Sequence, residues 1–177
     1  FMVMATQNPI EQEGTHPLPE AQLDRFMLNC KVDYPSKDDE RRTINRFTRD
    51  QAIEIEAVIS AEQIATMRGI PDQIHCDEHV GHYILDIVFA TRKPSDYKVD
   101  IDHQIEYGAS PRATLYLNLA ARANAMLNGR AYATPQDVKE IAHDVLRHRV
   151  ILTYEAEAED VTSEDVITHL LSELPVP

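Results

Sequence analysis

Apolar residues recur at helical spacing through most of the chain. Between 78 and 92 they occupy positions i, i+3, i+4, i+7 and i+8, which is typical of an amphipathic helix with one buried face. Asp77 stands before this run as a candidate N-cap. Similar runs, each opened by a serine or a threonine, predict helices over 110–128, 134–146 and 162–174.

Shorter helices are predicted earlier in the chain. Ser36 is a candidate N-cap for a helix that runs to about Arg49, with acidic residues in its first turn, where the helix dipole favours them. Ser60 and Gln63 form a capping box for a helix over 61–68. The stretch from Pro19 to Leu23 is long enough for one helical turn.

Two apolar runs, 1–6 and 26–32, have the length of buried strands, and each ends at a proline-containing turn. A short extended piece is predicted at 150–152. We expect 93–109 to be a polar loop and the acidic stretch 155–160 to be a solvated loop. The chain is therefore expected to be mainly α, with two strand remnants followed by a helical bundle.

Composition narrows the class of protein. The 177 residues, 43% of them apolar, suffice for one domain, or one small domain and a remnant, without disulfides. Cys30 and Cys76 are expected to be reduced thiols of a cytoplasmic protein. No run of about 18 apolar residues is present, and the start of the chain lacks the basic flank of a signal peptide. The chain opens inside an apolar run, so we expect it to be part of something longer.

The net charge of −13 argues against a nucleic-acid surface, which normally carries a basic stripe. Proteins or nucleotides are the more favoured partners.

Two polar residues near the start are candidate functional groups. Asn8 follows the first apolar run, at the kind of strand end where open α/β sheets place their ligands, although it can equally serve only to turn the chain before Pro9. Arg25 lies between apolar residues that can anchor it, and a fixed guanidinium can stabilise the charge of phosphoryl transfer. The alternative is a surface ion pair of Arg25 with Asp24 or Glu20.

Arg112 lies in the first turn of the helix predicted over 110–128. A cation is disfavoured there, whereas the free N–H groups of the helix end suit an anion. A phosphate would explain this arginine, but so would an ion pair with one of the surplus acidic residues.

The cluster His75, Cys76, His79 and His82, with Asp86 one turn further, is a candidate metal site, since thiol and imidazole groups suit zinc. A solvated helix face is the favoured interpretation, because apolar residues between these positions define the buried face, and no metal is expected. Ile84-Leu85-Asp86-Ile87 resembles a magnesium-binding strand only faintly, since it lies in helical periodicity. None of the five glycines precedes a lysine, so the chain holds no phosphate-cradling loop.

Taken together, A-T-Q-N-P-I-E-Q-E-G-T-H-P-L-P-E-A-Q-L-D-R-F, Y-G-A-S-P-R-A, A-T-P-Q-D-V and L-R-H-R-V-I-L-T-Y-E-A resemble the MoxR family of AAA+ ATPases, over essentially the whole chain. The resemblance implies the C-terminal half of such a protein. Residues 1–34 would be a remnant of the α/β core, and 35–177 the helical lid region.

The resemblance also implies roles. Asn8 would be the sensor-1 residue that positions the attacking water, Arg25 the arginine finger that enters a neighbouring subunit, and Arg112 the sensor-2 arginine, acting in its own subunit or the neighbour's. Asn8 and Arg112 would thereby contact ATP. The Walker motifs, which supply the lysine and the magnesium ligands, are missing, so ATP and Mg²⁺ belong to the parent protein.

Three functions of different classes follow. The first is a piece of an oligomeric ATPase, expected to form a hexameric ring, that remodels or matures protein complexes with von Willebrand A domain partners and is inactive alone. The second is a non-catalytic helical interaction module. The third is a zinc-containing regulatory domain.

Overall fold

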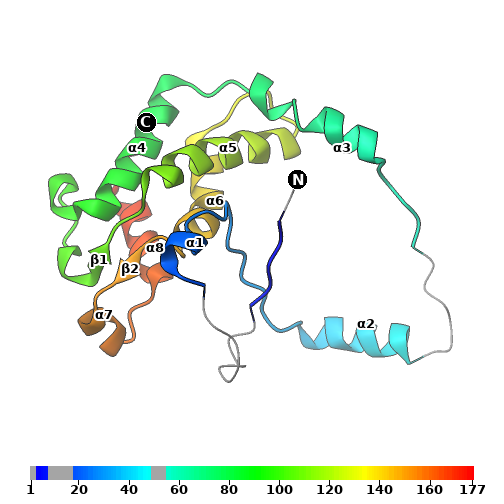
Figure 1. The fold of residues 1–177 in the computed structure, drawn as a ribbon, viewed down its shortest axis with the longest axis horizontal. Helices are drawn as coiled ribbons and strands as arrows, with labels where there is room; N and C mark the ends of the chain where they lie inside the picture. The colour runs from blue at the N-terminus through cyan, green and yellow to red at the C-terminus, as the bar shows by residue number, and fades with distance from the viewer. Residues whose placement is uncertain (1–2, 8–17, 49–54) are drawn as a thin grey trace.

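Helices dominate the computed structural model, which describes residues 3–7, 18–48 and 55–177 (Figure 1). This confirms the mainly helical class. The α-helices are α1 (Glu20–Leu23), α2 (Lys37–Phe47), α3 (Ala61–Met67), α4 (Glu78–Arg92), α5 (Pro111–Leu127), α6 (Pro135–Leu146), α7 (Tyr154–Ala158) and α8 (Ser163–Glu173). Short 3₁₀ turns occupy Pro71–Gln73, Pro94–Tyr97 and Asp102–Gln104.

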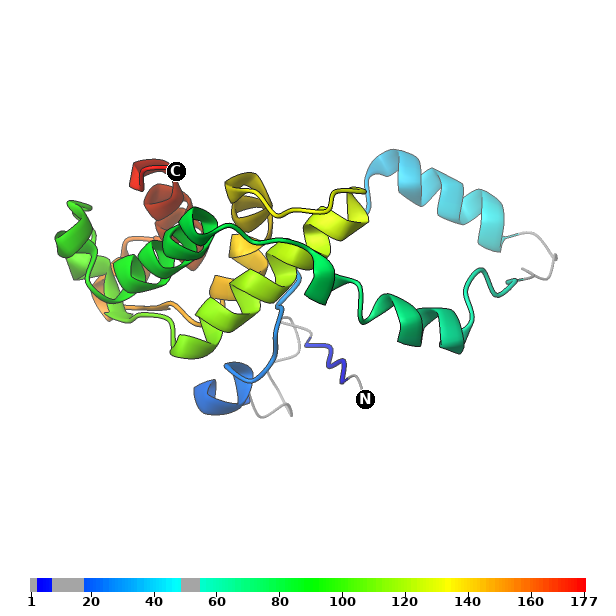
Figure 2. The same ribbon diagram turned by 90° about the horizontal axis from the view of Figure 1, so that it is seen from above.

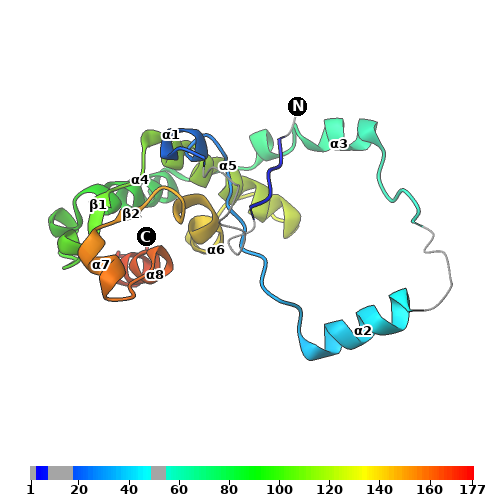
Figure 3. The same ribbon diagram turned by 60° about the horizontal axis from the view of Figure 1, so that its bottom comes forward.

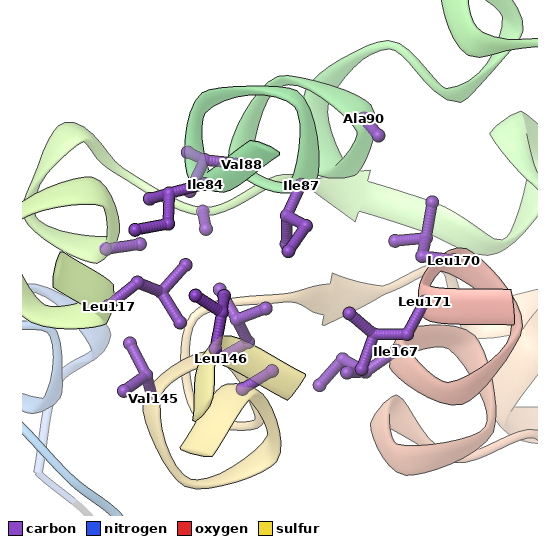
Figure 4. Close-up of a cluster of buried hydrophobic side chains, with 14 of the residues drawn as sticks. Ile84, Ile87, Val88, Ala90, Leu117, Val145, Leu146, Ile167, Leu170 and Leu171 are labelled. Atoms are coloured by element: carbon purple, nitrogen blue, oxygen red, sulfur yellow. The ribbon is translucent and has the colours of Figure 1, made fainter. Parts of the chain in front are cut away.

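The core lies between four helices of the C-terminal bundle. Side chains of α4, α5, α6 and α8 point into one common interior (Figure 4). All residues of the buried cluster fall between Ile74 and Leu174, so the packed part begins well after residue 35. The most enclosed large side chains in this interior are Tyr83, Ile84, Ile87, Leu117, Leu146, Ile167 and Leu170.

Side-chain caps fix where the bundle helices begin. Asp77 accepts a hydrogen bond from the backbone N–H of His79, and Ser110 accepts one from Arg112. Thr134 and Thr162 each begin a full capping box. These caps were predicted from the sequence, and each satisfies backbone donors that a helix leaves open at its start.

The one small sheet in the described part of the chain is not formed by the two predicted strands, 1–6 and 26–32. Strands β1 (Ile105–Tyr107) and β2 (Ile151–Leu152) pair antiparallel beside the bundle. The prediction that 93–109 is a polar loop is therefore wrong, since Val99, Ile101 and Ala109 are buried there. The short extended piece at 150–152 is confirmed as β2.

The acidic stretch 155–160 was also expected to be a loop, but most of it forms α7. Thr153 caps this helix by accepting a hydrogen bond from the backbone N–H of Ala156. The side chain of Ala156 is buried against the bundle, which explains why the acidic residues around it become helical.

The segment 26–32 forms no strand, and residues 3–7 also have no regular structure. Met4, at 80%, and Val32, at 93% of full exposure, lie in solvent, whereas Met27 packs half-buried against the core. A strand needs a neighbour to bond its backbone. Neither segment pairs with another strand among the described residues, so the strand predictions are wrong for 3–6 and 26–32; residues 1–2 of the first run lie outside the described residues.

Helices α2 and α3 project away from the bundle (Figure 1, Figure 2). Neither helix buries a single residue, and apolar side chains such as Ile44, Phe47 and Ile64 stay exposed. The segment around α1, by contrast, is attached to the bundle, because Asp24, which follows α1, accepts hydrogen bonds from Ser110 and Arg112 at the start of α5 (Figure 3).

Candidate phosphate-reading site

The candidate site is built around the carboxylate of Asp24, at the end of α1. The Oγ of Ser110 donates to Asp24 Oδ1 at 2.8 Å, and Arg112 Nη1 donates to Oδ2 at 2.7 Å. Arg149 Nε donates to Oδ1 at 3.0 Å. One carboxylate thus joins α1 to the first turn of α5 and to the loop after α6.

Arg149 is the most deeply buried charged group of this site. Its side chain has 0% exposure, against 17% for Asp24, and its guanidinium lies 5.0 Å from the ring centre of Tyr116. Burial lowers the pKa of Arg149, and the charge of Asp24 opposes that effect. A guanidinium without water must find its partners within the protein, and Arg149 has them.

Most of those partners are backbone carbonyls of the segment 24–29. Arg149 donates to the carbonyls of Asp24, at 2.9 Å, and of Phe26. The neighbouring His148 ring nitrogen Nε2 lies 3.1 Å from the same Phe26 carbonyl, and Arg147 donates to the carbonyl of Asn29. We call these three basic residues, 147–149, the basic clamp.

The basic clamp explains why 26–32 forms no strand. Its carbonyls are occupied by side chains of the lid, and the backbone N–H of Asn29 donates to the carbonyl of Asp144 at 2.8 Å. The pKa of His148 falls to about 4 because it is buried and lies beside Arg149. A neutral His148 avoids placing another positive charge beside Arg149.

Arg25 lies between two clamped residues but is itself exposed. Its carbonyl accepts a hydrogen bond from the Tyr116 hydroxyl at 3.2 Å. Within the described ranges, its side chain makes no hydrogen bond and no ion pair. The alternative pairing with Asp24 or Glu20 is therefore not formed, and the guanidinium has no partner among residues 3–7, 18–48 and 55–177.

Arg112 does make the ion pair that the sequence left open, and its partner is Asp24. The side chain of Arg112 is 48% exposed and uses Nη1 for this bond. Burial raises the pKa of Asp24, but the bonds from Arg112 and Ser110 and the charge of Arg149 outweigh it, so the net shift is downward. Asp24 is therefore ionised at neutral pH.

Charge at this site is not balanced by the groups that bond one another. Asp24 supplies one negative charge, whereas Arg112 and Arg149 supply two positive charges. The N-terminus of α5 adds partial positive charge through the helix dipole, although Ser110 already accepts hydrogen bonds from the N–H groups of Arg112 and Ala113. The arrangement therefore has room, electrostatically, for one more anion.

Asn8 lies outside the described residues. Of the other two predicted site residues, Arg112 bonds Asp24, and Arg25 follows Asp24 directly in the chain. Sequence reasoning missed Asp24, Ser110 and the basic clamp as parts of one site. A signal was present, because Arg149 stands between the apolar residues Leu146 and Val150 of an acidic chain, a setting that requires a partner for a buried cation.

Two side chains of the candidate metal cluster bond other protein groups. Cys76 Sγ accepts from Asn118 Nδ2 at 3.4 Å, and Asp86 Oδ1 accepts from the Tyr97 hydroxyl at 3.2 Å. Across the ranges that the structure describes, no group of three His, Cys, Asp or Glu side chains is placed to hold a metal ion. The zinc hypothesis therefore has no site among the described residues.

Cys76 and His82 instead line an open, mainly apolar groove of about 610 Å³ between α4 and α5.

The motif A-T-P-Q-D-V has a structural role. The Asp137 side chain is 1% exposed and completes the capping box of α6 with Thr134. Arg130 donates to both of its oxygens, at 2.5 and 2.7 Å. These bonds hold the pKa of Asp137 far below its usual range, although burial alone would raise it.

Comparison with known families assigns both parts of the chain. Residues 99–170 match the model described as "AAA lid domain". Residues 1–28 match the model "ATPase family associated with various cellular activities (AAA)". Most of the bundle thus matches an AAA lid domain, and the start of the chain matches the AAA family model.

Individual relatives show which family of AAA-type ATPases the chain resembles. The chain is 44% identical over 180 residues to "Chaperone MoxR1" of Mycobacterium tuberculosis, covering all of this chain and 47% of the relative. It is 30% identical to "Protein MoxR" of Methylorubrum extorquens, covering 55% of that protein. A crystal structure of a "putative ATPase" from Cytophaga hutchinsonii superposes with a TM-score of 0.92 at 39% identity, over 97% of this chain and 52% of that one.

The chain belongs to the MoxR family of AAA+ ATPases and matches the C-terminal part of its members. It spans about half the length of the curated relatives it matches. Among the helices of the described ranges, none is long and apolar enough to cross a membrane.

Proposed function

We propose that this chain is the sensing part of an ATPase ring that couples ATP hydrolysis to the remodelling or maturation of protein complexes. The observation that carries the proposal is the state of Arg25. Its backbone is held to the lid on both sides, while its guanidinium stays exposed and without a partner in the described part of the chain. Such a group can act outside its own subunit.

In this proposal Arg25 is an arginine finger that reaches the nucleotide of a neighbouring subunit. Arg112, which lies in the lid, contacts a phosphate of the nucleotide, and Asn8 positions the attacking water. Support for the role of Arg112 comes from its exposure and from the unbalanced positive charge around Asp24. A finger of this kind raises hydrolysis by about 10³–10⁵-fold where it has been measured.

The site fits the anionic half of the implied cofactor. Arg112 would contact a phosphate of ATP, because its guanidinium is about half exposed and lies at the helix end where the dipole favours an anion. Magnesium is different, since the described residues offer no cluster of carboxylates for it. In this proposal the metal is held by residues of the parent protein beyond this chain.

The partners follow from the same proposal. Identical subunits would form the ring, for which we propose a hexamer, and the remodelled complex would include a von Willebrand A domain protein. The name "Chaperone MoxR1" of one relative supports a protein-directed role. The net charge of −13 also favours proteins over nucleic acid. The proposal places the protein in the cytoplasm.

The direct test is Arg25→Ala in the full-length protein that carries this chain. We expect hydrolysis to fall by about 10³-fold or more while nucleotide affinity stays within about threefold. Arg41→Ala is the matched control, since Arg41 is an exposed arginine on α2 with a distant partner at 3.9 Å. Hydrolysis that survives within about twofold rules out the finger.

The second candidate is a non-catalytic interaction module. The apolar groove between α4 and α5 favours it, because open apolar surface of this kind suits a protein segment. Full-rate hydrolysis in Arg25→Ala and Arg112→Ala alike would support this reading and remove the ATPase role of both residues.

A further inference from the structure

The Asp24 site holds its two arginines in unequal ways. Arg149 is fully enclosed and bonds the carboxylate together with several backbone carbonyls. Arg112 is about half exposed and bonds the carboxylate alone, through a single nitrogen. Removing Arg149 would leave buried carbonyls without donors, whereas Arg112 can turn into water at small cost.

Asp24 would remain satisfied if Arg112 left. Its Oδ1 keeps the bonds from Arg149 at 3.0 Å and from Ser110 at 2.8 Å. The carboxylate and Arg149 then form a neutral pair. The released Arg112 and the end of α5 would hold the positive charge that an incoming anion needs.

We propose that Asp24 is a positioning residue that binds the Arg112 guanidinium when no nucleotide is present. When a nucleotide phosphate arrives, Arg112 leaves Asp24 and bonds the phosphate, while Arg149 keeps Asp24 in place. This inference rests on the proposed function. Asp24 directly precedes Arg25, so the residue that bonds the proposed phosphate-binding Arg112 is also the chain neighbour of the proposed arginine finger, Arg25.

The exchange makes Asp24 a competitor of the phosphate for Arg112. An exposed ion pair of this kind stabilises the paired state only slightly, so the fraction of free Arg112 is reduced rather than abolished. Apparent affinity falls with the fraction that is competent to bind. Removing the competitor should therefore tighten nucleotide binding by about two- to sixfold.

The test is Asp24→Asn in the full-length protein, with a non-hydrolysable ATP analogue titrated by calorimetry. We expect tighter binding by that factor, and no gain from Asp24→Asn when Arg112→Ala is also present. Asp38→Asn, which removes an exposed carboxylate from an ion pair on α2, should leave affinity unchanged. A merely structural Asp24 would instead weaken binding when it is replaced.

Unchanged or weaker binding in Asp24→Asn overturns the inference, and so does an equal gain in the Arg112→Ala background. If Asp24→Asn does not fold because Arg149 is left unpaired, Asp24→Asn with Arg149→Met removes both buried charges, and the same gain is expected. The Arg25→Ala result separates the two ideas. Hydrolysis lost in Arg25→Ala without a gain in Asp24→Asn leaves the ATPase role standing and rejects the exchange.

Discussion

Replacing Arg149 by methionine removes the centre of the basic clamp. Methionine has a similar length and no charge, so it can fill the space beside Tyr116 without adding a polar group. The carboxylate of Asp24 keeps Arg112 and Ser110. The backbone carbonyls of Asp24 and Phe26, however, lose the donor that Arg149 supplies.

The loss of stability in Arg149→Met depends on the contacts that Asp24 keeps. Removing one partner of a buried ion pair typically costs about 3–5 kcal/mol, because the other charge is left uncompensated. Here Asp24 is 17% exposed and retains a second arginine, which reduces that penalty. We therefore expect the free energy of unfolding to fall by about 2–4 kcal/mol.

Urea denaturation followed by far-ultraviolet circular dichroism measures this loss. A fall of that size should lower the urea midpoint by about 1–2 M with an unchanged slope. Arg42→Met is the matched control. Its guanidinium is 82% exposed and pairs with Asp39 at 3.3 Å, so a loss below about 1 kcal/mol is expected.

A loss below about 1 kcal/mol for Arg149→Met, equal to that of the control, would refute the reasoning. The clamp would then contribute no more than a surface ion pair. Hydrogen exchange adds a local readout, since protection of the Asn29 amide should fall in Arg149→Met if the segment 24–29 leaves the lid.

Three further predictions test the bundle. The folded-state pKa of Glu164 is about 2, because bonds from Lys31 and Arg147 outweigh the burial that would raise it. The ionised Glu164 therefore stabilises the fold fully above about pH 4.5, and this stabilisation is lost as the pH falls towards 2. Acid titration of Glu164→Gln should show about 1 kcal/mol less loss over that window, and an unchanged acid limb would contradict the assignment. Gly108→Ala should destabilise the protein by more than about 2 kcal/mol, since an added Cβ would lie 2.3 Å from the Thr91 carbonyl oxygen. Gly81→Ala should instead stabilise it by about 0.5–1 kcal/mol, because Gly81 is helical and its Cβ would meet open space. Thermal melts that rank the two variants in the reverse order would refute this. Asp137→Ala should cost about 3–5 kcal/mol in urea denaturation, and a loss below about 1 kcal/mol would show that its bonds matter little.

Local signals predicted the bundle well. The caps at Asp77, Ser110, Thr134 and Thr162 act within a few residues of the helices they begin, so the sequence alone reveals them. Helical periodicity over 78–92 likewise gives the buried face of α4 correctly. Such features depend on neighbours in the chain and need no knowledge of tertiary contacts.

Contacts between distant segments were not predictable in the same way. The run 26–32 has the composition of a strand, but its carbonyls bind the basic clamp, more than a hundred residues later. Residues 105–107 form a strand by pairing with β2, and α7 packs on the core through the buried Ala156. In each case a tertiary partner decided the structure, and periodicity carries no information about it.

The same limit applies to the candidate site. The resemblance to a family singled out Arg25 and Arg112 one residue at a time. Their connection through Asp24 required the fold, because Asp24 and Ser110 are 86 residues apart in the chain.

The most direct test of the central claim, that Arg25 acts across a subunit junction, is a mixing experiment. Full-length Arg25→Ala protein is combined with protein whose own phosphate-binding lysine, outside this chain, is replaced. Each is expected to be inactive alone, but in randomly mixed rings about a quarter of the junctions pair an intact pocket with an intact Arg25. If Arg25 acts across the junction, the mixture hydrolyses ATP at up to about a quarter of the wild-type rate, whereas mixed rings as inactive as the two separate proteins would contradict that role.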